Sequence, residues 1–190
     1  MSDVPVSGRE RVLDAAYDLF CRSGVTAVGV DAVIARAGTA KATLYRNFGS
    51  KDELTLAFLQ RREERWTYGW LIAEVMSRAD DPRDRLLAVF DVLDEWFATP
   101  DFEGCAFINV MLESGVANTA VRRASVRHLA TIRGFFERLA ADAGIEDADA
   151  FGRQWHILMK GAIVSAGEGD AQAARRAQEL GELLLARHAV

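Results

Sequence analysis

The chain has 190 residues, half of them apolar, so it can bury a substantial core as one helical domain or as two small ones. Its net charge of −5 at pH 7 excludes a protein that coats nucleic acid indiscriminately, because non-specific binding depends on lysine and arginine neutralising phosphates. With only three prolines, the composition favours helices throughout.

The cysteines and the lack of long apolar runs bear on the compartment. Cys21 and Cys105 lie in unrelated segments without metal-ligand spacing, which indicates a reducing compartment and no disulfide framework. No signal segment opens the chain, and no apolar run approaches the roughly 20 residues of a membrane span. We therefore expect a cytoplasmic protein without a membrane partner.

The first predicted helix starts at a capping box. In Ser7–Glu10, the serine oxygen can accept a backbone N–H while the glutamate reaches back to the helix start. Apolar residues then recur with a helical period up to Gly24, at Val12, Ala15, Ala16, Leu19 and Phe20.

Residues 24–51 predict a helix-turn-helix. Apolar residues at helical spacing define a short helix over residues 30–37, and Gly38 can end it in the left-handed conformation. A second helix follows over residues 40–48, with Leu44 and Phe48 on its inner face. Residues 36–51 hold four basic side chains and no acidic one. The positive charge is therefore concentrated on the segment that could read DNA.

The rest of the chain predicts helices only. A second capping box, Ser50–Glu53, starts a long helix from Lys51 to about Ala79, and Asp81-Pro82 starts another to about residue 98. Further helices are expected over residues 105–114, then from an Asn118 cap to 143, and over 148–166 and 171–187. The fold class is therefore all-α with about nine helices. Residues 7–53 form a small N-terminal head, and residues 54–190 form a larger helical body.

Several segments of the head stand in the order and spacing of a known family. They are R-x-x-x-L-x-A-A-x-x-L-F from Arg9, G-V-T-A from Gly24, the pair Ala37-Gly38, T-L-Y-R-N-F from Thr43 and S-K-D-E-L from Ser50. Over about residues 8–55 the chain resembles the TetR family of bacterial transcriptional regulators. The resemblance implies a homodimer that binds a near-palindromic operator as double-stranded DNA, with a ligand-binding and dimerisation body. It further implies a repressor that a small, largely apolar effector releases by shifting the long fourth helix.

The resemblance also implies the DNA contacts. Base edges would be read by Lys41, Ala42, Thr43 and Asn47, and phosphates would be bound by Tyr45, Arg46 and Lys51. The chain departs from the family pattern at Val28-Gly29 and at Ala40, where hydroxyl side chains are common. The alternative for these basic residues is a solvated helix face without a role in DNA binding.

Aromatic and polarizable side chains in the body suggest an effector pocket. The candidates are Trp66, Trp70, Phe90, Phe107, Met111, Trp155 and Met159; ordinary core packing is the alternative for each. Asn109 and Glu113 lie at i, i+4 and could orient a ligand if they face inward, or could equally be a solvated glutamate and a capping or core-bonded asparagine. Cys105 could sense redox state, although a buried structural cysteine is commoner.

The last two predicted helices carry small residues at helical spacing. Two copies could pack through them as a four-helix dimer interface, formed by Ile157, Leu158, Gly161, Ala162, Ser165, Ala174, Ala177, Leu180, Gly181 and Leu184. Packing within one protomer is the alternative. The three histidines stand on separate predicted helices, and no catalytic motif is present, so we expect no metal, no cofactor and no enzymatic activity. Two other hypotheses remain open: a helical small-molecule-binding protein, and an adaptor, both without specific DNA binding.

Overall fold

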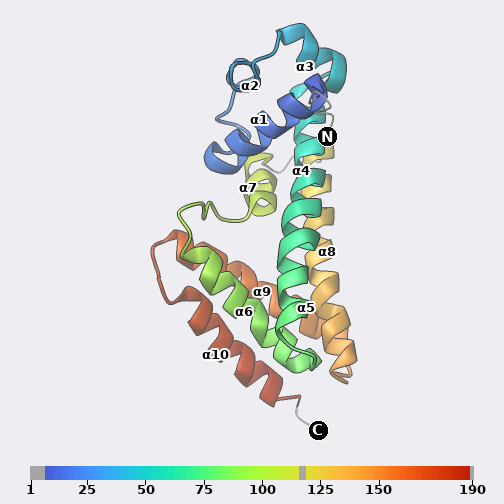
Figure 1. Cartoon of the computed structure of the whole chain (residues 1–190). Coiled ribbons are helices and arrows are strands. Elements are labelled where there is room, and N and C mark those ends of the chain that lie inside the picture. Colours follow the sequence, from blue (N-terminus) through green and yellow to red (C-terminus); the bar gives the residue numbers. More distant parts are fainter. Residues whose placement is uncertain (1–6, 116–118, 189–190) are drawn as a thin grey trace, which may run out of the picture. The chain divides into compact units, whose positions relative to one another are not determined.

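A computed structural model describes residues 7–115 and 119–188 of the chain. Within these ranges the fold is all-helical and contains nine continuous helices, when the consecutive segments α4, η1 and α5 are taken as one (Figure 1). The chain forms two compact units: the residues up to Glu63 with Ala106–His128, and Glu64–Cys105 with the residues from Leu129 onward. Residues 106–128 therefore belong to the same compact unit as the predicted N-terminal head, residues 7–53. The division at residue 54 remains a prediction about function.

The first unit is built on α1 (Gly8–Ser23), which packs against α2 (Val30–Ala37), α3 (Lys41–Phe48) and α4 (Lys51–Arg62) (Figure 1). Ser7 caps α1 by accepting a hydrogen bond from the Glu10 amide at 3.2 Å, and Gly24 ends it at a φ of 77°. The core of this unit holds apolar side chains from all four helices, including Val12, Ala16, Val33, Leu44, Phe48 and Phe58.

Arg61 fastens α4 to α1. Its side chain is mostly buried and donates to Asp14 at 2.9 Å and to Glu10 at 2.5 Å. The hydrogen bond from the Arg61 guanidinium lowers the pKa of the Glu10 carboxyl below its usual value. The helix that precedes the helix-turn-helix is therefore held to the helix that follows it.

The long helix predicted from Lys51 to about Ala79 is not α-helical throughout. After α4, residues Glu63–Ile72 form the π-helix η1, and Ala73–Arg78 form α5. In this wider turn the Cα of Gly69 lies so close to the preceding backbone that a Cβ there would be 3.0 Å from the Glu64 carbonyl oxygen. Apolar periodicity could not reveal η1, because π-helical segments are rare and carry no simple sequence pattern.

Helix α7 (Ala106–Glu113) belongs to the first unit, and helix α8 (Ala120–Asp142) contributes residues to both units. The predicted cap of α8, Asn118, lies outside the described residues, whereas the Thr119 hydroxyl accepts a hydrogen bond from the Arg122 amide at 3.1 Å. The Thr119 side chain therefore satisfies one of the free amides at the start of α8.

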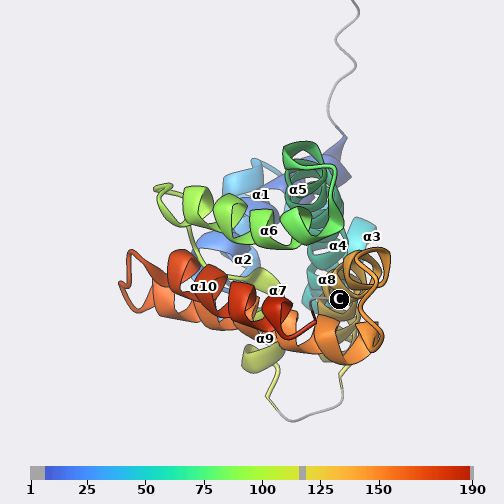
Figure 2. The same ribbon diagram turned by 90° about the horizontal axis from the view of Figure 1, so that it is seen from below.

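The second unit contains α6 (Pro82–Phe97), α9 (Ala148–Gly167) and α10 (Ala173–Ala186), and α10 lies beside both others (Figure 2). Trp155 of α9 is fully buried and stacks on Phe151 at 5.3 Å between ring centroids. A Cβ on Gly181 would approach the Trp155 ring to 2.7 Å, so glycine at this position lets α10 pack closely on that ring.

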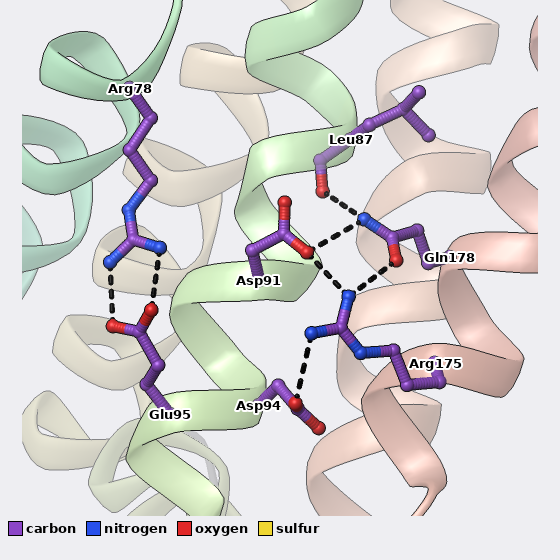
Figure 3. Close-up of polar contacts among 7 residues, drawn as sticks. All are labelled: Arg78, Leu87, Asp91, Asp94, Glu95, Arg175 and Gln178. Atoms are coloured by element: carbon purple, nitrogen blue, oxygen red, sulfur yellow. Dashed lines mark hydrogen bonds and ion pairs between the residues drawn. The ribbon is translucent and has the colours of Figure 1, made fainter.

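Polar side chains also join α10 to α6 (Figure 3). Arg175 donates to Asp91 at 2.6 Å and lies 3.1 Å from a carboxylate oxygen of Asp94. The Gln178 amide donates to the Leu87 carbonyl at 3.2 Å and to Asp91 at 3.0 Å. The orientation of α10 is thus set by directional contacts as well as by apolar packing.

The buried His156 of α9 predicts a loss of stability in mild acid. Its side chain is 4% exposed, and burial, assisted by the charges of Lys160 and Arg133, lowers its pKa from 6.5 to about 3. Below pH 6.5 the unfolded imidazole binds a proton that the folded one does not, so stability present above pH 6.5 is lost as pH falls toward 3. From pH 7 to 5 we expect this residue alone to lower the unfolding free energy by about 2 kcal/mol.

Urea unfolding at pH 7 and pH 5 checks this expectation. The variant His156→Gln should show a smaller pH dependence than the unsubstituted protein. Glu10, Glu95 and Asp149, whose pKa values are also lowered, contribute little to the pH dependence between pH 7 and pH 5, because their usual values lie at 4.5 or less. Equal pH dependence in the two proteins would contradict the prediction.

Candidate nucleic-acid interface

The helix-turn-helix forms over the residues predicted from the sequence. Gly38 adopts the left-handed conformation, with φ 58° and ψ 42°, and its amide closes the last turn of α2 by donating to the Ala35 carbonyl at 3.3 Å. Leu44 and Phe48 of α3 are buried in the first unit. Burial of this inner face turns the opposite face of α3 to solvent.

The predicted DNA-contacting residues are gathered on this outer face and at the start of α4. Five of them are exposed, namely Lys41, Ala42, Tyr45, Arg46 and Asn47, and two are half-buried, Thr43 and Lys51. Tyr45 is 44% exposed, as expected because Leu44 and Phe48 already occupy the inner face of α3. The arrangement presents cations, an amide and a phenol together, which are groups that bind phosphates and base edges.

Two of these side chains already have partners within the first unit. The Lys41 ammonium lies 3.2 Å from Asp31 of α2, and the Asn47 amide donates to the Thr43 carbonyl at 2.7 Å. Both contacts are exposed to solvent, where such pairs contribute little, so DNA groups can replace them at small cost. Arg46 and Lys51 form no ion pair with any residue that the structure describes.

Sequence reasoning missed that the start of α1 lies against α3. The Arg9 guanidinium stands over the Phe48 ring, 5.1 Å from its centroid. A Cβ on Gly8 would come within 2.8 Å of the Thr43 methyl group. The capping box located the start of α1, but no local pattern indicates which helix it contacts.

The departures at Val28-Gly29 and Ala40 have the structural consequence expected of them. Gly29 caps α2 and Ala40 caps α3, and neither helix start receives a side-chain hydrogen bond from its cap residue. Ser50, in contrast, caps α4 by accepting from the Glu53 amide at 3.1 Å. Only the helix that follows the helix-turn-helix therefore has a side-chain cap within this segment.

The predicted effector-binding residues do not belong to one compact unit. Four lie on α7 in the first unit, namely Phe107, Asn109, Met111 and Glu113; five lie in the second unit, namely Trp66, Trp70, Phe90, Trp155 and Met159. Trp66, Phe90, Phe107, Trp155 and Met159 are buried. Burial agrees with the alternative of core packing for these five.

One aromatic cluster of the second unit remains partly open to solvent. The ring centroids of Trp66 and Trp70 of η1 lie 5.4 Å apart. The ring centroid of Trp96 of α6 lies 5.2 Å from that of Trp66 and 5.9 Å from that of Trp70. Trp70 and Trp96 are half-buried. The sequence grouped these aromatic residues by helical spacing, but it could not show that Trp96 joins the two tryptophans of η1.

Asn109 and Glu113 are both exposed, which is the placement of the solvated alternative and not that of buried ligand anchors. The Glu113 carboxylate accepts a hydrogen bond from the Thr26 amide at 2.7 Å. Cys105 is buried. Among the described residues no group of His, Cys, Asp and Glu could hold a metal ion, and no helix there is long and apolar enough to cross a membrane.

Comparison with known proteins gives one consistent family. Residues 12–58 match the model of the bacterial regulatory proteins of the tetR family. The chain is 31% identical over 141 residues to the HTH-type transcriptional activator FasR of Mycolicibacterium smegmatis; the match covers 73% of this chain and 61% of FasR, so it spans less than two thirds of that relative.

Two solved structures extend the likeness to nearly the whole chain. SCO4454, a TetR-family transcriptional regulator from Streptomyces coelicolor, has a TM-score of 0.87 at 29% identity, covering 97% of this chain and 91% of its own. SAV143 of Streptomyces avermitilis, assigned to the TetR transcriptional regulators, has a TM-score of 0.86 at 32% identity, covering 96% and 98%. The protein described here belongs to the tetR family of bacterial regulatory proteins.

Proposed function

We propose that the protein binds a near-palindromic operator as a homodimer, that it acts as a repressor, and that a small, largely apolar effector releases it from DNA. The observation that carries this proposal is the outer face of α3. Its exposed Lys41, Tyr45 and Arg46 stand on a helix whose inner face is buried in a helix-turn-helix. A helix presented in this way fits the major groove.

Within this proposal the side chains divide by chemistry. Lys41 can donate to guanine O6 or N7, and Asn47 can pair with the edge of adenine once it leaves the Thr43 carbonyl. Ala42 offers its methyl group to thymine, and Thr43 can offer its hydroxyl group to a base edge. Tyr45, Arg46 and Lys51 bind phosphates, together with the free amides at the start of α4.

The proposed dimer interface is the exposed face shared by α9 and α10. Ile157, Leu180 and Leu183 are exposed large apolar residues, and a groove of about 340 Å³ runs between them and their neighbours. Of the residues predicted for this interface, Ala162, Ala174, Ala177 and Gly181 are buried within the protomer. The exposed Leu183 joins Ile157 and Leu180 as the apolar side chains that would contact the partner. Two copies joined through the apolar face would form a four-helix interface.

The effector site that we propose is the aromatic cluster of Trp66, Trp70 and Trp96. Large apolar surfaces that stay half-exposed are suited to binding apolar molecules. Three of the four tryptophans of the chain lie in this cluster, so its occupation would change the intrinsic fluorescence.

Loss of the Arg46 cation tests DNA binding directly. With a duplex selected from random DNA, Arg46→Ala should weaken binding at least about 10-fold. It should also make the slope of log affinity against log salt shallower by about two. Each protomer of the dimer loses one phosphate contact, and each such contact contributes about 0.9 to the slope. Fluorescence anisotropy at several salt concentrations measures both quantities.

The matched control is Arg153→Ala on α9. Arg153 is exposed and is paired with Asp149 at 2.8 Å, so its loss removes the same charge away from α3 and should leave the salt slope unchanged. An Arg46→Ala variant with an unaltered slope would contradict the phosphate contact. Tight binding of small molecules with no DNA dependence would favour the alternative of a helical ligand-binding protein, and capture of a protein partner alone would favour an adaptor.

A further inference from the structure

The turn between α1 and α2 is held by a side chain that is 87 residues away in the sequence. Glu113, the last residue of α7, accepts a hydrogen bond from the Thr26 amide at 2.7 Å. Both residues belong to the first unit, in which α7 packs against α4 (Figure 1). The acceptor is a carboxylate, so this is a charge-assisted hydrogen bond, although both residues are exposed to solvent.

The turn is shaped for this contact. Gly24 has a φ of 77°, a backbone conformation that residues other than glycine rarely adopt. A Cβ at that position would also lie 2.5 Å from a carboxylate oxygen of Glu113. Gly29, at the end of the turn, gives α2 no side-chain hydrogen bond. The turn that leads into α2 therefore has no side-chain cap of its own at Gly29, and the Glu113 carboxylate supplies a side-chain hydrogen bond to its backbone.

The end of α7 that carries Glu113 is itself fixed by α8. The Arg122 guanidinium donates to the carbonyls of Met111 and Gly115, each at 2.8 Å. Near the other end of α7, the Phe107 ring stacks on His128 of α8 with 5.1 Å between centroids. A displacement of α7 with α8 would therefore move the carboxylate that binds the Thr26 amide.

We propose that Glu113 is a positioning residue for DNA binding, and that the position of α7 is transmitted to the helix-turn-helix through its hydrogen bond with Thr26. This inference rests on the proposed function, because it needs a DNA-binding helix to position. Thr26 stands four residues before α2, and α2 packs against α3. The bond therefore fixes the entry of the chain into the segment that carries Lys41 and Arg46.

A purely electrostatic role for Glu113 makes different predictions. Glu113 and Lys51 line the same cavity of about 270 Å³. In this alternative, the charge of the carboxylate affects how Lys51 binds DNA, and the hydrogen bond with Thr26 has no role. Glu113→Gln keeps an acceptor oxygen at the same reach and removes the charge. Glu113→Asp keeps the charge but is one methylene shorter, and Glu113→Ala removes both.

The experiment compares these three variants of the full chain. The positioning role predicts that Glu113→Gln binds the selected duplex within about twofold of the unsubstituted protein, whereas Glu113→Asp and Glu113→Ala bind on the order of 10-fold more weakly. The salt slope should not change, because no phosphate contact is lost. In the free protein, hydrogen exchange at the Thr26 amide should accelerate on the order of 10-fold in the Asp and Ala variants only.

Three outcomes would overturn the proposal. If Glu113→Asp behaves as the unsubstituted protein and Glu113→Gln does not, the charge matters and the hydrogen bond does not. If exchange at Thr26 accelerates while affinity is unchanged, the bond is structural alone. If the unsubstituted protein selects no DNA, the proposed function fails with it, and the exchange measurement in free protein still shows separately whether the bond exists.

Discussion

Replacing Leu183 by arginine is expected to convert the dimer into monomers and to weaken operator binding by on the order of 100-fold. Leu183 is 66% exposed on α10, at the groove that we propose as the dimer interface. Transfer of an unpaired guanidinium into an apolar interface is strongly unfavourable, and two-fold symmetry repeats the substitution on both sides. A monomer holds only one recognition helix, so the second half-site contributes nothing.

Analytical ultracentrifugation and DNA titration measure the two effects. The matched control is Leu112→Arg on α7, since Leu112 is also a leucine with 66% exposure but lies in the other unit. The control should sediment as a dimer. A dimeric Leu183→Arg protein would place the interface elsewhere.

Truncation of Trp155 to alanine is expected to lower the free energy of unfolding by about 3–5 kcal/mol, the usual range for a buried tryptophan. The ring is fully buried between Phe151 and Phe90, each 5.3 Å away between centroids. Trp155→Phe should cost much less, because it keeps a ring and removes an indole N–H that has no hydrogen-bond partner among the described residues.

A double-mutant cycle with Gly181→Ala makes this prediction specific to the packing of α10. In the unsubstituted protein the added methyl group meets the Trp155 ring at 2.7 Å and should cost about 1–3 kcal/mol. In the Trp155→Ala protein the same methyl group meets only the Phe90 ring, at 3.2 Å, so most of that cost should vanish. Chemical unfolding at one fixed protein concentration gives all four values; additive costs would contradict the contact.

Local sequence signals were sufficient for the head of the protein. The serines at positions 7 and 50 cap their helices as predicted, and Gly38 ends α2 in the left-handed conformation. The inner residues Leu44 and Phe48 are buried as the helical period required. Each of these features depends on groups within a few residues of one another, which is why the sequence alone could predict them.

Features that depend on distant contacts could not be read in the same way. Small residues at helical spacing indicate close packing but not the partner, and Ala174, Ala177 and Gly181 pack within the protomer. The i, i+4 spacing of Asn109 and Glu113 could not show that Glu113 reaches Thr26, because 87 residues separate them. The π-helical η1 likewise follows from backbone geometry that apolar periodicity does not record.

Selection of bound duplexes from random DNA tests whether α3 reads DNA as part of a dimer. We expect enrichment of a two-fold symmetric sequence. We also expect Asn47→Ala to relax one position in each half-site while leaving the spacing between half-sites unchanged. Selection that enriches no symmetric sequence, or an Asn47→Ala protein that selects an unchanged sequence, would contradict this role of α3.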